Sequence, residues 1–329
     1  MNSTIRPSFI GFYEKYKLMM HNKKEKKNVY LLGQGWLAKG FIDTIDKNKF
    51  KIINISRNKF VYTPQLLQSI KSTETSDITS ELIIKKVDEY HNEEIISVDL
   101  DKKVIETNNN KYNWNNSYLV CGLGSHIDIG KYWENEFNKI KKMNKNDTIN
   151  IVGSGVTGTE LAFHLNDLGY KIKVIDFLLL DKIYTFVNNE SKNKILYLLE
   201  QNNIKLVTGR LYDKHVDDGN VIFATGSRTN DLTSKWKITN QLCVENYNDV
   251  FAGGDCITQK LPKNAQVAYQ QGVYIAKKIN GDKKLKDFEY VDNGIALYSG
   301  NSHYLVEINN KQYVLPSFIV NMYYEYIKN

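Results

Sequence analysis

Asp249–Gly272, with the sequence DVFAGGDCITQKLPKNAQVAYQQG, is the stretch that decides the fold of this chain. The apolar run Val250–Ala252 predicts a short buried strand, because it stops at two glycines that permit close backbone approach and is followed by Asp255. Beyond Pro262, Asn264 is placed to cap a helix whose apolar and small residues recur on one face. The amino end of a helix beside a glycine-rich strand end favours electron-rich oxygens. The stretch therefore predicts a strand, a turn and a helix start that face a ligand, with an ordinary strand-turn-helix as the alternative.

A glycine fingerprint occurs twice upstream of this stretch. GQGWLA follows the strand-forming run Asn28–Leu32, and GSGVTG follows Thr148–Val152. In each copy a helical pattern and a second strand come next. The residue 23 positions after the first glycine is Ser56 in one copy and Asp176 in the other. The fingerprint residues are Gly33, Gly35, Trp36, Leu37 and Ala38 in the first copy, and Gly153, Gly155, Val156, Thr157 and Gly158 in the second. Two copies in one frame predict two dinucleotide sites.

The residue types of the fingerprint suit a pyrophosphate. The first glycine makes a tight turn, the second lets the backbone approach the phosphates, and the small third residue lets the helix pack on the strand. Asp176 is placed to bond both ribose hydroxyls of an adenosine, which favours NADH because a 2′-phosphate would meet a like charge. A solvated acid at a strand end is the alternative. The first copy has no acid at Ser56 or Arg57.

Each copy closes with a related apolar run that ends in Gly-Ser. The runs are YLVCGLGS at Tyr118–Ser125 and VIFATGS at Val221–Ser227. A tight turn at Gly124 or Gly226 would let backbone N–H groups face a cofactor, although a plain strand-to-loop turn would look the same. Only a short connection, starting at Gly209, precedes the second run.

The C-terminal part predicts a small segment of strands and one helix. Asp287–Ile308 alternates enough to indicate strands, with turns at Gly294 and Gly300. Phe318–Ile327 has helical spacing and carries an aromatic stripe. The stripe fits a core or a dimer surface, and an interfacial helix on a membrane would look similar.

The composition is that of a globular protein with room for two domains. The chain has 329 residues, of which 42% are hydrophobic and 25% charged, and no apolar run approaches the length that spans a bilayer. The net charge of +7 leaves an acidic partner or an anionic membrane surface open, whereas no basic motif interleaved with aromatic residues predicts nucleic-acid binding. The six histidines lack metal-ligand spacing, so we expect no metal.

Cysteine usage and the first residues favour a cytoplasmic protein. Cys121, Cys243 and Cys256 lie far apart in the sequence and form no C-x-x-C arrangement, which fits a reducing compartment. Residues 1–27 are polar and basic and contain no uninterrupted apolar segment, which argues against a secretory signal. A targeting segment or a simple tail is the alternative for them.

Taken together, these segments resemble the type II NADH dehydrogenases, the single-subunit NADH:quinone oxidoreductases among the flavoproteins with two dinucleotide-binding domains (pyridine nucleotide-disulfide oxidoreductase-like). The resemblance covers about residues 28–325. It is carried by GQGWLA with SRNKFVYTPQLL (Ser56–Leu67), GSGVTGTE (Gly153–Glu160), FAGGDC (Phe251–Cys256), AQVAYQQG (Ala265–Gly272) and NGIALYSG (Asn293–Gly300). Ala-Gln-x-Ala-x-Gln within AQVAYQQG is similar to the quinone-site pattern of that family.

The resemblance implies an α/β fold in which an NAD domain is inserted into an FAD domain, both Rossmann-like, with a small C-terminal β/α segment. The implied boundaries are 1–27 for an N-terminal tail, 28–147 for the first part of the FAD domain, 148–248 for the NAD(H)-binding domain, 249–285 for the return of the FAD domain and 286–329 for the C-terminal segment.

The resemblance also implies contacts to FAD. The first fingerprint would hold the FAD pyrophosphate, Ser56–Arg57 would lie at its adenosine, and Thr63 would lie near the isoalloxazine. Asp255 would bind the ribityl chain. The helix start at Ala265–Gln266 would face the flavin carbonyl end, where the positive end of the helix dipole stabilises reduced flavin.

The same resemblance implies that three residues contact the reacting groups. Glu160 would sit beside the nicotinamide of NADH, and Gln266 and Gln270, four apart on one helix face, would border a quinone. Hydride would pass from NADH to the flavin, and two electrons would pass on to the quinone. A surface acid and a polar helix face are the alternatives for these side chains.

Two departures from the family pattern leave other functions open. The second domain is short between Gly209 and Val221, and the chain stops at Asn329 where relatives continue into membrane-attaching helices. The expected partners are NADH and a quinone-like acceptor, with peripheral membrane association and a homodimer left open. An NAD(P)H reductase for another acceptor, such as a ferredoxin or a soluble quinone, and a nucleotide-binding flavoprotein without turnover are the alternatives.

Overall fold

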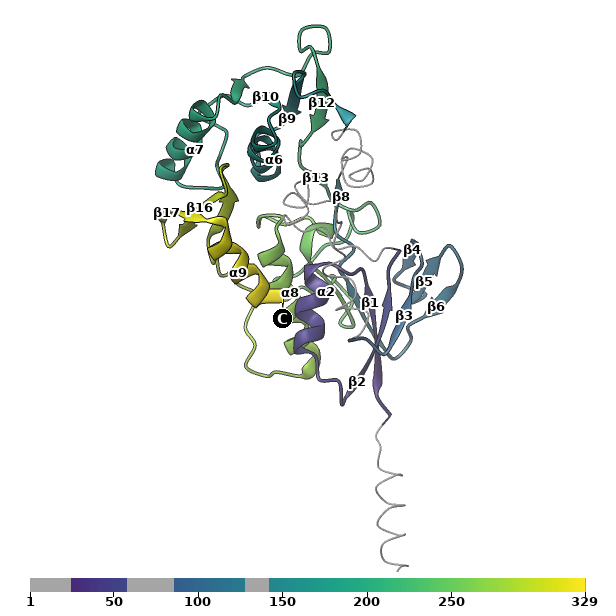
Figure 1. Ribbon diagram of the computed structural model, residues 1–329. Helices are drawn as coiled ribbons and strands as arrows, with labels where there is room; N and C mark the ends of the chain where they lie inside the picture. Colours follow the sequence, from purple (N-terminus) through teal and green to yellow (C-terminus); the bar gives the residue numbers. More distant parts are fainter. Residues whose placement is uncertain (1–24, 58–85, 128–141, 329) are drawn as a thin grey trace, which may run out of the picture.

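The computed structural model describes residues 25–57, 86–127 and 142–328 (Figure 1). Two parallel sheets with packed helices lie one above the other, and the C-terminal elements lie beside both. This is the α/β architecture with two Rossmann-like units that the sequence predicts. Within the described residues, no helix is both long and apolar enough to cross a bilayer.

The first sheet is made of five parallel strands. In spatial order they are β14 (Val250–Ala252), β7 (Tyr118–Cys121), β1 (Lys27–Leu32), β2 (Phe50–Ile55) and β3 (Glu89–His91). β14 follows the second sheet in the chain, yet it pairs with β7 so that Ala252 lies opposite Cys121. The predicted strand at Val250–Ala252 is therefore confirmed, and it brings the chain back to the first sheet.

Helices α2 (Trp36–Thr44) and α8 (Ala265–Asn280) pack against each other on one face of this sheet. Two glycines permit the contact. A Cβ atom at Gly272 would lie 2.1 Å from the Leu37 carbonyl oxygen, and one at Gly40 would lie 2.2 Å from the Tyr269 carbonyl oxygen. The backbones therefore approach more closely than any side chain would allow. The predicted cap of α8 is confirmed, because the Asn264 side chain accepts a hydrogen bond from the Val267 N–H at 2.9 Å.

The other face of the first sheet is covered by an antiparallel sheet. Its strands are β4 (Ile95–Asp99), β5 (Val104–Thr107) and β6 (Lys111–Asn113). Ile105 and Trp114 are fully buried between the two sheets. With both faces covered, β1, β2 and β7 are buried along most of their length, as expected for parallel strands.

The second sheet repeats the parallel pattern with four strands. In spatial order they are β11 (Lys205–Thr208), β10 (Lys171–Asp176), β9 (Thr148–Val152) and β12 (Asn220–Phe223), accompanied by α6 (Val156–Asp167) and α7 (Asn189–Gln201). A short antiparallel pair, β8 (His126–Ile127) with β13 (Ser227–Arg228), joins the segments that follow β7 and β12. The closing turns of the two units therefore lie near each other.

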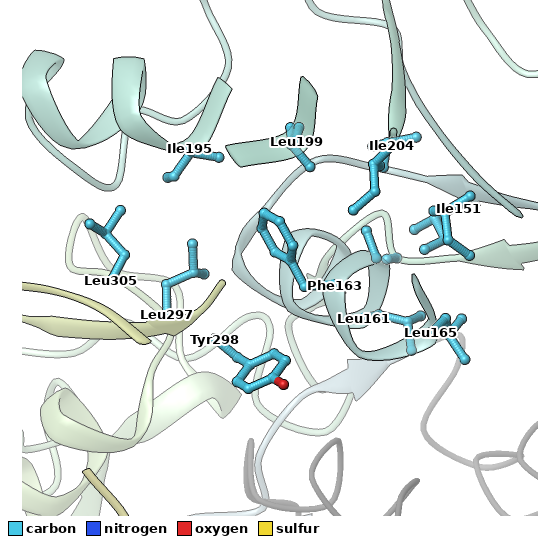
Figure 2. Close-up of a cluster of buried hydrophobic side chains, with 14 of the residues drawn as sticks. Ile151, Leu161, Phe163, Leu165, Ile195, Leu199, Ile204, Leu297, Tyr298 and Leu305 are labelled. Atoms are coloured by element: carbon cyan, nitrogen blue, oxygen red, sulfur yellow. The ribbon is translucent and has the colours of Figure 1, made fainter. Parts of the chain in front are cut away.

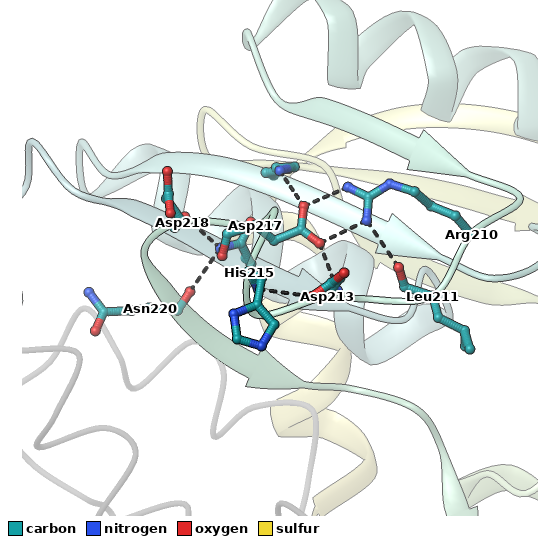
Figure 3. Close-up of polar contacts among 9 residues, drawn as sticks. Arg210, Leu211, Asp213, His215, Asp217, Asp218 and Asn220 are labelled. Carbon is teal, nitrogen blue, oxygen red and sulfur yellow. Dashed lines mark hydrogen bonds and ion pairs between the residues drawn. The ribbon is translucent and has the colours of Figure 1, made fainter.

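The short connection between β11 and β12 is held to the sheet by a buried carboxylate (Figure 3). The side chain of Asp217 is fully buried, and its two oxygens bond the Arg210 guanidinium at 2.8 and 2.5 Å. Lys173 of β10 adds an ion pair at 2.5 Å. The Arg210 guanidinium holds the pKa of Asp217 well below its usual range. Asn150 of β9 donates to the Asp218 carbonyl oxygen at 2.9 Å, so both ends of the connection are tied down.

The C-terminal elements share their core with the second sheet (Figure 2). They are β15 (Ile295–Tyr298), β16 (His303–Ile308), β17 (Lys311–Pro316) and α9 (Ser317–Lys328). Leu297 and Leu305 pack in one cluster with Phe163 of α6 and Ile195 of α7. The predicted helix is present, whereas the predicted strands begin only at Ile295, because the preceding residues lie as a loop against α8.

Candidate functional site

Two glycine loops of matching geometry stand at the carboxyl ends of β1 and β9. Gly33 and Gly153 adopt φ angles of 95° and 107°, in the left-handed region that favours glycine. A Cβ atom at Gly33 would lie 2.3 Å from the Gly122 carbonyl oxygen, and one at Gly153 would lie 2.4 Å from the Ala224 carbonyl oxygen. The first glycine of each loop is thus required by the strand beside it.

The second glycine of each loop faces open space. An ideal Cβ at Gly35 or Gly155 would meet no described atom within 4 Å. Both residues are the N-cap of the following helix, and no described side chain bonds the amino end of α2 or α6. The first N–H groups of these helices, which include Trp36, Leu37 and Ala38 in one and Val156, Thr157 and Gly158 in the other, have no acceptor within their own helix. The open glycine and the uncapped helix end fit a phosphate in each unit.

The third small residue of each fingerprint has a packing role. Ala38 is fully buried in α2. A Cβ atom at Gly158 would lie 2.0 Å from the Gly153 carbonyl oxygen, so α6 can approach its loop only with glycine there.

Asp176 is tied to the second glycine loop. It ends β10 and is buried, and one of its oxygens accepts hydrogen bonds from the Ser154 N–H at 2.8 Å and the Ser154 hydroxyl at 2.7 Å. Its other oxygen accepts from the Leu178 N–H at 2.9 Å. A solvated acid is therefore not what the structure shows. The partner Ser154 was not among the predicted site residues, since only its place between two glycines marks it.

In the first unit, the position that corresponds to Asp176 is Ser56, which is not an acid. Ser56 follows β2, and Arg57 pairs with Glu94 at 2.9 Å. The buried side chain of Asn54 donates to the carbonyl oxygens of Leu31 and Gly33 at 2.9 and 2.8 Å, so it holds the first glycine loop. Sequence reasoning missed Asn54 because a polar residue within an apolar strand gives no sign of its partner. Thr63 lies outside the described residues.

The closing turns and the return segment complete the edge of the first sheet. Gly124 and Gly226 have φ angles of 70° and 93°, and a Cβ atom at either would meet open space. Asp255 lies in the short 3-10 turn Gly254–Cys256, directly after β14. Burial raises the pKa of Asp255, and the nearby charge of Lys263 opposes that effect. Because β1, β7 and β14 are neighbours, their carboxyl ends bring Gly33, Gly124 and Asp255 to one edge.

Helix α8 is tied to this edge by a residue that the sequence did not single out. Gln271 is fully buried, and its side-chain oxygen accepts a hydrogen bond from the Gly254 N–H at 2.5 Å. Its amide nitrogen donates to the Gln259 side chain at 2.7 Å. Ala268 lies in the first turn of α8, and its Cβ would be 3.4 Å from a Cβ atom at Gly254, so the positive end of the helix lies beside the turn that contains Asp255.

The two predicted acceptor-side glutamines contact the backbone of the loop before β15. Gln266 donates to the Gly294 carbonyl oxygen at 2.6 Å, and Gln270 donates to the Val291 carbonyl oxygen at 2.8 Å. Each carboxamide nitrogen carries two hydrogens, and among the described contacts each uses one of them here. Their proposed contact with an acceptor stays a prediction.

Glu160 is buried one turn and a half into α6. It is 4% exposed, and its carboxylate accepts a hydrogen bond from the Tyr298 N–H at 3.0 Å. Burial raises the pKa of Glu160 to about 7, and the Tyr298 hydrogen bond opposes the shift. The side chain is thus not the surface acid of the alternative reading, and a carboxyl group with a pKa near neutrality holds or releases a proton easily.

Two cysteines that lie far apart in the sequence meet in the core. The Cys256 thiol lies 3.6 Å from the Cys121 carbonyl oxygen and 3.1 Å from the Gly253 carbonyl oxygen. Both side chains are free and fully buried. Thiols that are inaccessible in this way act as packing residues.

Residues 25–272 match the family model of the pyridine nucleotide-disulphide oxidoreductases. The chain belongs to this family. The match spans both glycine loops, Asp176 and the return segment up to Gly272, and it makes the protein an oxidoreductase by family.

The named relatives are distant from this chain in sequence. The chain is 24% identical to a probable mitochondrial NADH-ubiquinone oxidoreductase of Schizosaccharomyces pombe, over 78% of this chain and 62% of that protein. It is 23% identical to the type II NADH:quinone oxidoreductase of Staphylococcus aureus, over 84% and 89% of the two chains. Its structure is similar to that of NDH2 from Plasmodium falciparum in complex with NADH, with a TM-score of 0.77, 15% identity and coverage of 93% and 95%. This likeness confirms the predicted fold class.

Proposed function

We propose that the protein is an FAD-dependent oxidoreductase that takes hydride from NADH and passes two electrons to a quinone-like acceptor. The observation that carries the proposal is the pair of glycine loops, each with an open second glycine and an uncapped helix end. Two such loops at the edges of two parallel sheets suit two dinucleotides. The names of the relatives, an NADH-ubiquinone oxidoreductase and a type II NADH:quinone oxidoreductase, support the choice of electron donor and acceptor.

The first loop is assigned to FAD. The N–H groups at the amino end of α2 bond the pyrophosphate, while Gly35 lets the backbone reach it. Asp255 bonds the ribityl hydroxyls, and the amino end of α8 lies toward the flavin carbonyls, where its dipole favours negative charge. When bound, FAD accepts hydride from NADH and returns two electrons to the acceptor.

The second loop is assigned to NADH. Gly155 and the amino end of α6 bond the pyrophosphate, and Asp176 accepts hydrogen bonds from the ribose hydroxyls. The Ser154 hydroxyl and N–H already point at one oxygen of Asp176, so they hold the carboxylate in place for the ribose. Glu160, further along α6, lies beside the nicotinamide and orients it.

The acceptor is assigned to the amino end of α8. Gln266 and Gln270 each keep a second amide hydrogen after bonding the loop before β15, and this hydrogen is available for a quinone carbonyl. The same backbone contacts hold both side chains in one orientation. The glutamines thus bind the acceptor without having to give up their structural contacts.

Peripheral contact with a membrane belongs to the same proposal, since a lipid-soluble quinone lies in a bilayer. Val314 on β17 and Phe318, Ile319 and Met322 on α9 are exposed apolar side chains at the C-terminal surface, in a chain with a net charge of +7. Such a surface suits an anionic membrane. The purified protein should float with anionic liposomes, and retention in the protein fraction would instead favour a cytoplasmic enzyme with a soluble acceptor.

Anaerobic spectroscopy tests the central proposal. The purified protein should be yellow, and NADH should bleach its flavin absorbance within one turnover. Ubiquinone-1 or menadione should then restore the absorbance faster than oxygen does. A colourless protein that takes up no FAD would refute the flavin assignment, and a reduced flavin that reacts with neither quinone would shift the acceptor to another class, such as a ferredoxin.

A further inference from the structure

The loop and strand Tyr290–Tyr298, here called the strap, crosses from one nucleotide unit to the other. Its first part lies against α8 of the first unit. Gln270 both donates to the Val291 carbonyl oxygen at 2.8 Å and accepts from the Val291 N–H at 3.0 Å. One turn earlier, Gln266 donates to the Gly294 carbonyl oxygen at 2.6 Å and accepts from the Asn293 N–H at 3.2 Å. Two side chains of one helix face therefore hold the strap through its backbone.

The other end of the strap lies against α6 of the second unit. Glu160 accepts the Tyr298 N–H at 3.0 Å, and the ring of His164 stacks on the ring of Tyr298 with centroids 3.8 Å apart and an angle of 1° between the planes. The Tyr298 hydroxyl donates to Asp167. Glu160, His164 and Asp167 are spaced four and three residues apart, so one face of α6 makes all three contacts.

The segment between these two ends is short, and its length is constant. From Gly294 to Tyr298 the chain advances four residues, which in a strand span about 13 Å. Ile295–Tyr298 of this part form β15, which pairs with β16 so that Ala296 lies opposite Val306. Gly294 adopts a φ of 89°, and a Cβ atom there would lie 2.1 Å from the Glu307 carbonyl oxygen. A paired, extended segment of this length acts as a spacer of constant length between α8 and α6.

We propose that the strap sets the spacing between the two nucleotide units for hydride transfer, and that Tyr298 is its positioning residue. The proposal rests on the proposed function, which places the nicotinamide at Glu160 on α6 and the flavin at the amino end of α8. Tyr298 touches neither nucleotide in this account. It acts through α6, the helix that carries Glu160. The ring and hydroxyl of Tyr298 hold α6 at one end of the strap, while Gln266 and Gln270 hold the other end on α8, so the strap fixes the distance between the two helices.

The kinetic consequence follows from the geometry of hydride transfer. The reacting atoms must approach to about 3–3.5 Å, and a misplacement of about 1 Å can cost roughly 100-fold in rate. Tyr298→Leu removes both the ring stack and the hydroxyl bond. We expect it to slow flavin reduction by about 10- to 100-fold while NADH binding changes by less than about threefold, because Asp176 and the glycine loop are untouched. Tyr298→Phe keeps the ring and should recover most of the rate.

Rapid-mixing measurement of flavin reduction in the flavin-loaded protein separates these effects. Tyr197→Leu makes the same chemical change at an exposed tyrosine of α7 and serves as the matched control, so it should reduce its flavin at the wild-type rate. A Tyr298→Leu protein that also reduces its flavin at the wild-type rate would overturn the proposal. So would an equal loss of NADH affinity in Tyr298→Leu, since disruption of the NADH site would then explain the slower reduction.

Hydrogen exchange of the same protein without substrate gives a readout that does not depend on activity. The double variant Gln266→Ala/Gln270→Ala releases the strap at α8, and we expect faster exchange of the backbone N–H of Tyr298 at the opposite end, by about tenfold or more. Unchanged exchange at Tyr298 would show that the two ends are independent and would refute the strap. If wild-type protein is not reduced by NADH, the proposed function fails, while the exchange experiment still decides whether the two units are mechanically joined.

Discussion

Replacing Glu160 by glutamine should change how the stability of this protein depends on pH. The wild-type carboxyl group is 4% exposed, and burial raises its pKa from the ordinary 4.5 to about 7. Between these two values the folded protein binds more protons than the unfolded chain, so the free energy of unfolding falls as the pH rises. A shift of this size corresponds to about 3 kcal/mol, at 1.36 kcal/mol for each pKa unit. The loss begins near pH 4.5 and is complete somewhat above pH 7.

Glu160→Gln removes this titration and keeps the local contact, because a carboxamide oxygen can still accept the Tyr298 N–H. Urea unfolding at several pH values between 4.5 and 8 measures the effect. The variant should gain about 3 kcal/mol relative to wild type across this range. Asp181→Asn removes an exposed acid from the same unit and is the control that should follow wild type. Parallel curves for wild type and Glu160→Gln would refute the argument, since they would mean that Glu160 ionises normally in the fold.

Three further predictions concern the glycine loops and the Asp217 contacts. Gly35→Val should fold but take up little FAD, as measured by flavin absorbance, because its backbone is extended and its side chain would enter only the open space assigned to the pyrophosphate. Gly155→Val should keep its flavin while the KM for NADH rises by about tenfold or more, as for one lost contact of about 1.4 kcal/mol, and an unchanged KM would contradict the assignment of the second loop. Arg210→Ala should lower the midpoint of urea unfolding, because it leaves the buried Asp217 with Lys173 as its remaining cation; an unchanged midpoint would show that the contact is dispensable.

Local requirements of the backbone were predictable from the sequence. Gly33 and Gly153 adopt the left-handed φ that the tight turns of the two fingerprints predict, and Asn264 caps the helix that starts beside it. The strand at Val250–Ala252 and the helix after it appear where the apolar pattern indicates them. Resemblance to a known family supplied the order of the two units, since nothing local tells a strand such as β14 which sheet it will join.

What only the tertiary structure decided is the set of partners. Helical spacing puts Gln266 and Gln270 on one face and Glu160 inside a helix, but it does not say that the first two contact the loop before β15 or that the third lies under Tyr298. Gln266 bonds a residue 28 positions away and Glu160 one 138 positions away. Asp217, from a stretch that read only as a short connection, became a buried anion because Arg210 and Lys173 converge on it. Periodicity reports which side of an element is buried, whereas the identity of the neighbour depends on how distant elements pack. The sequence by itself therefore determined where the two nucleotide loops form, and the packing of the C-terminal strands decided how the two units are joined.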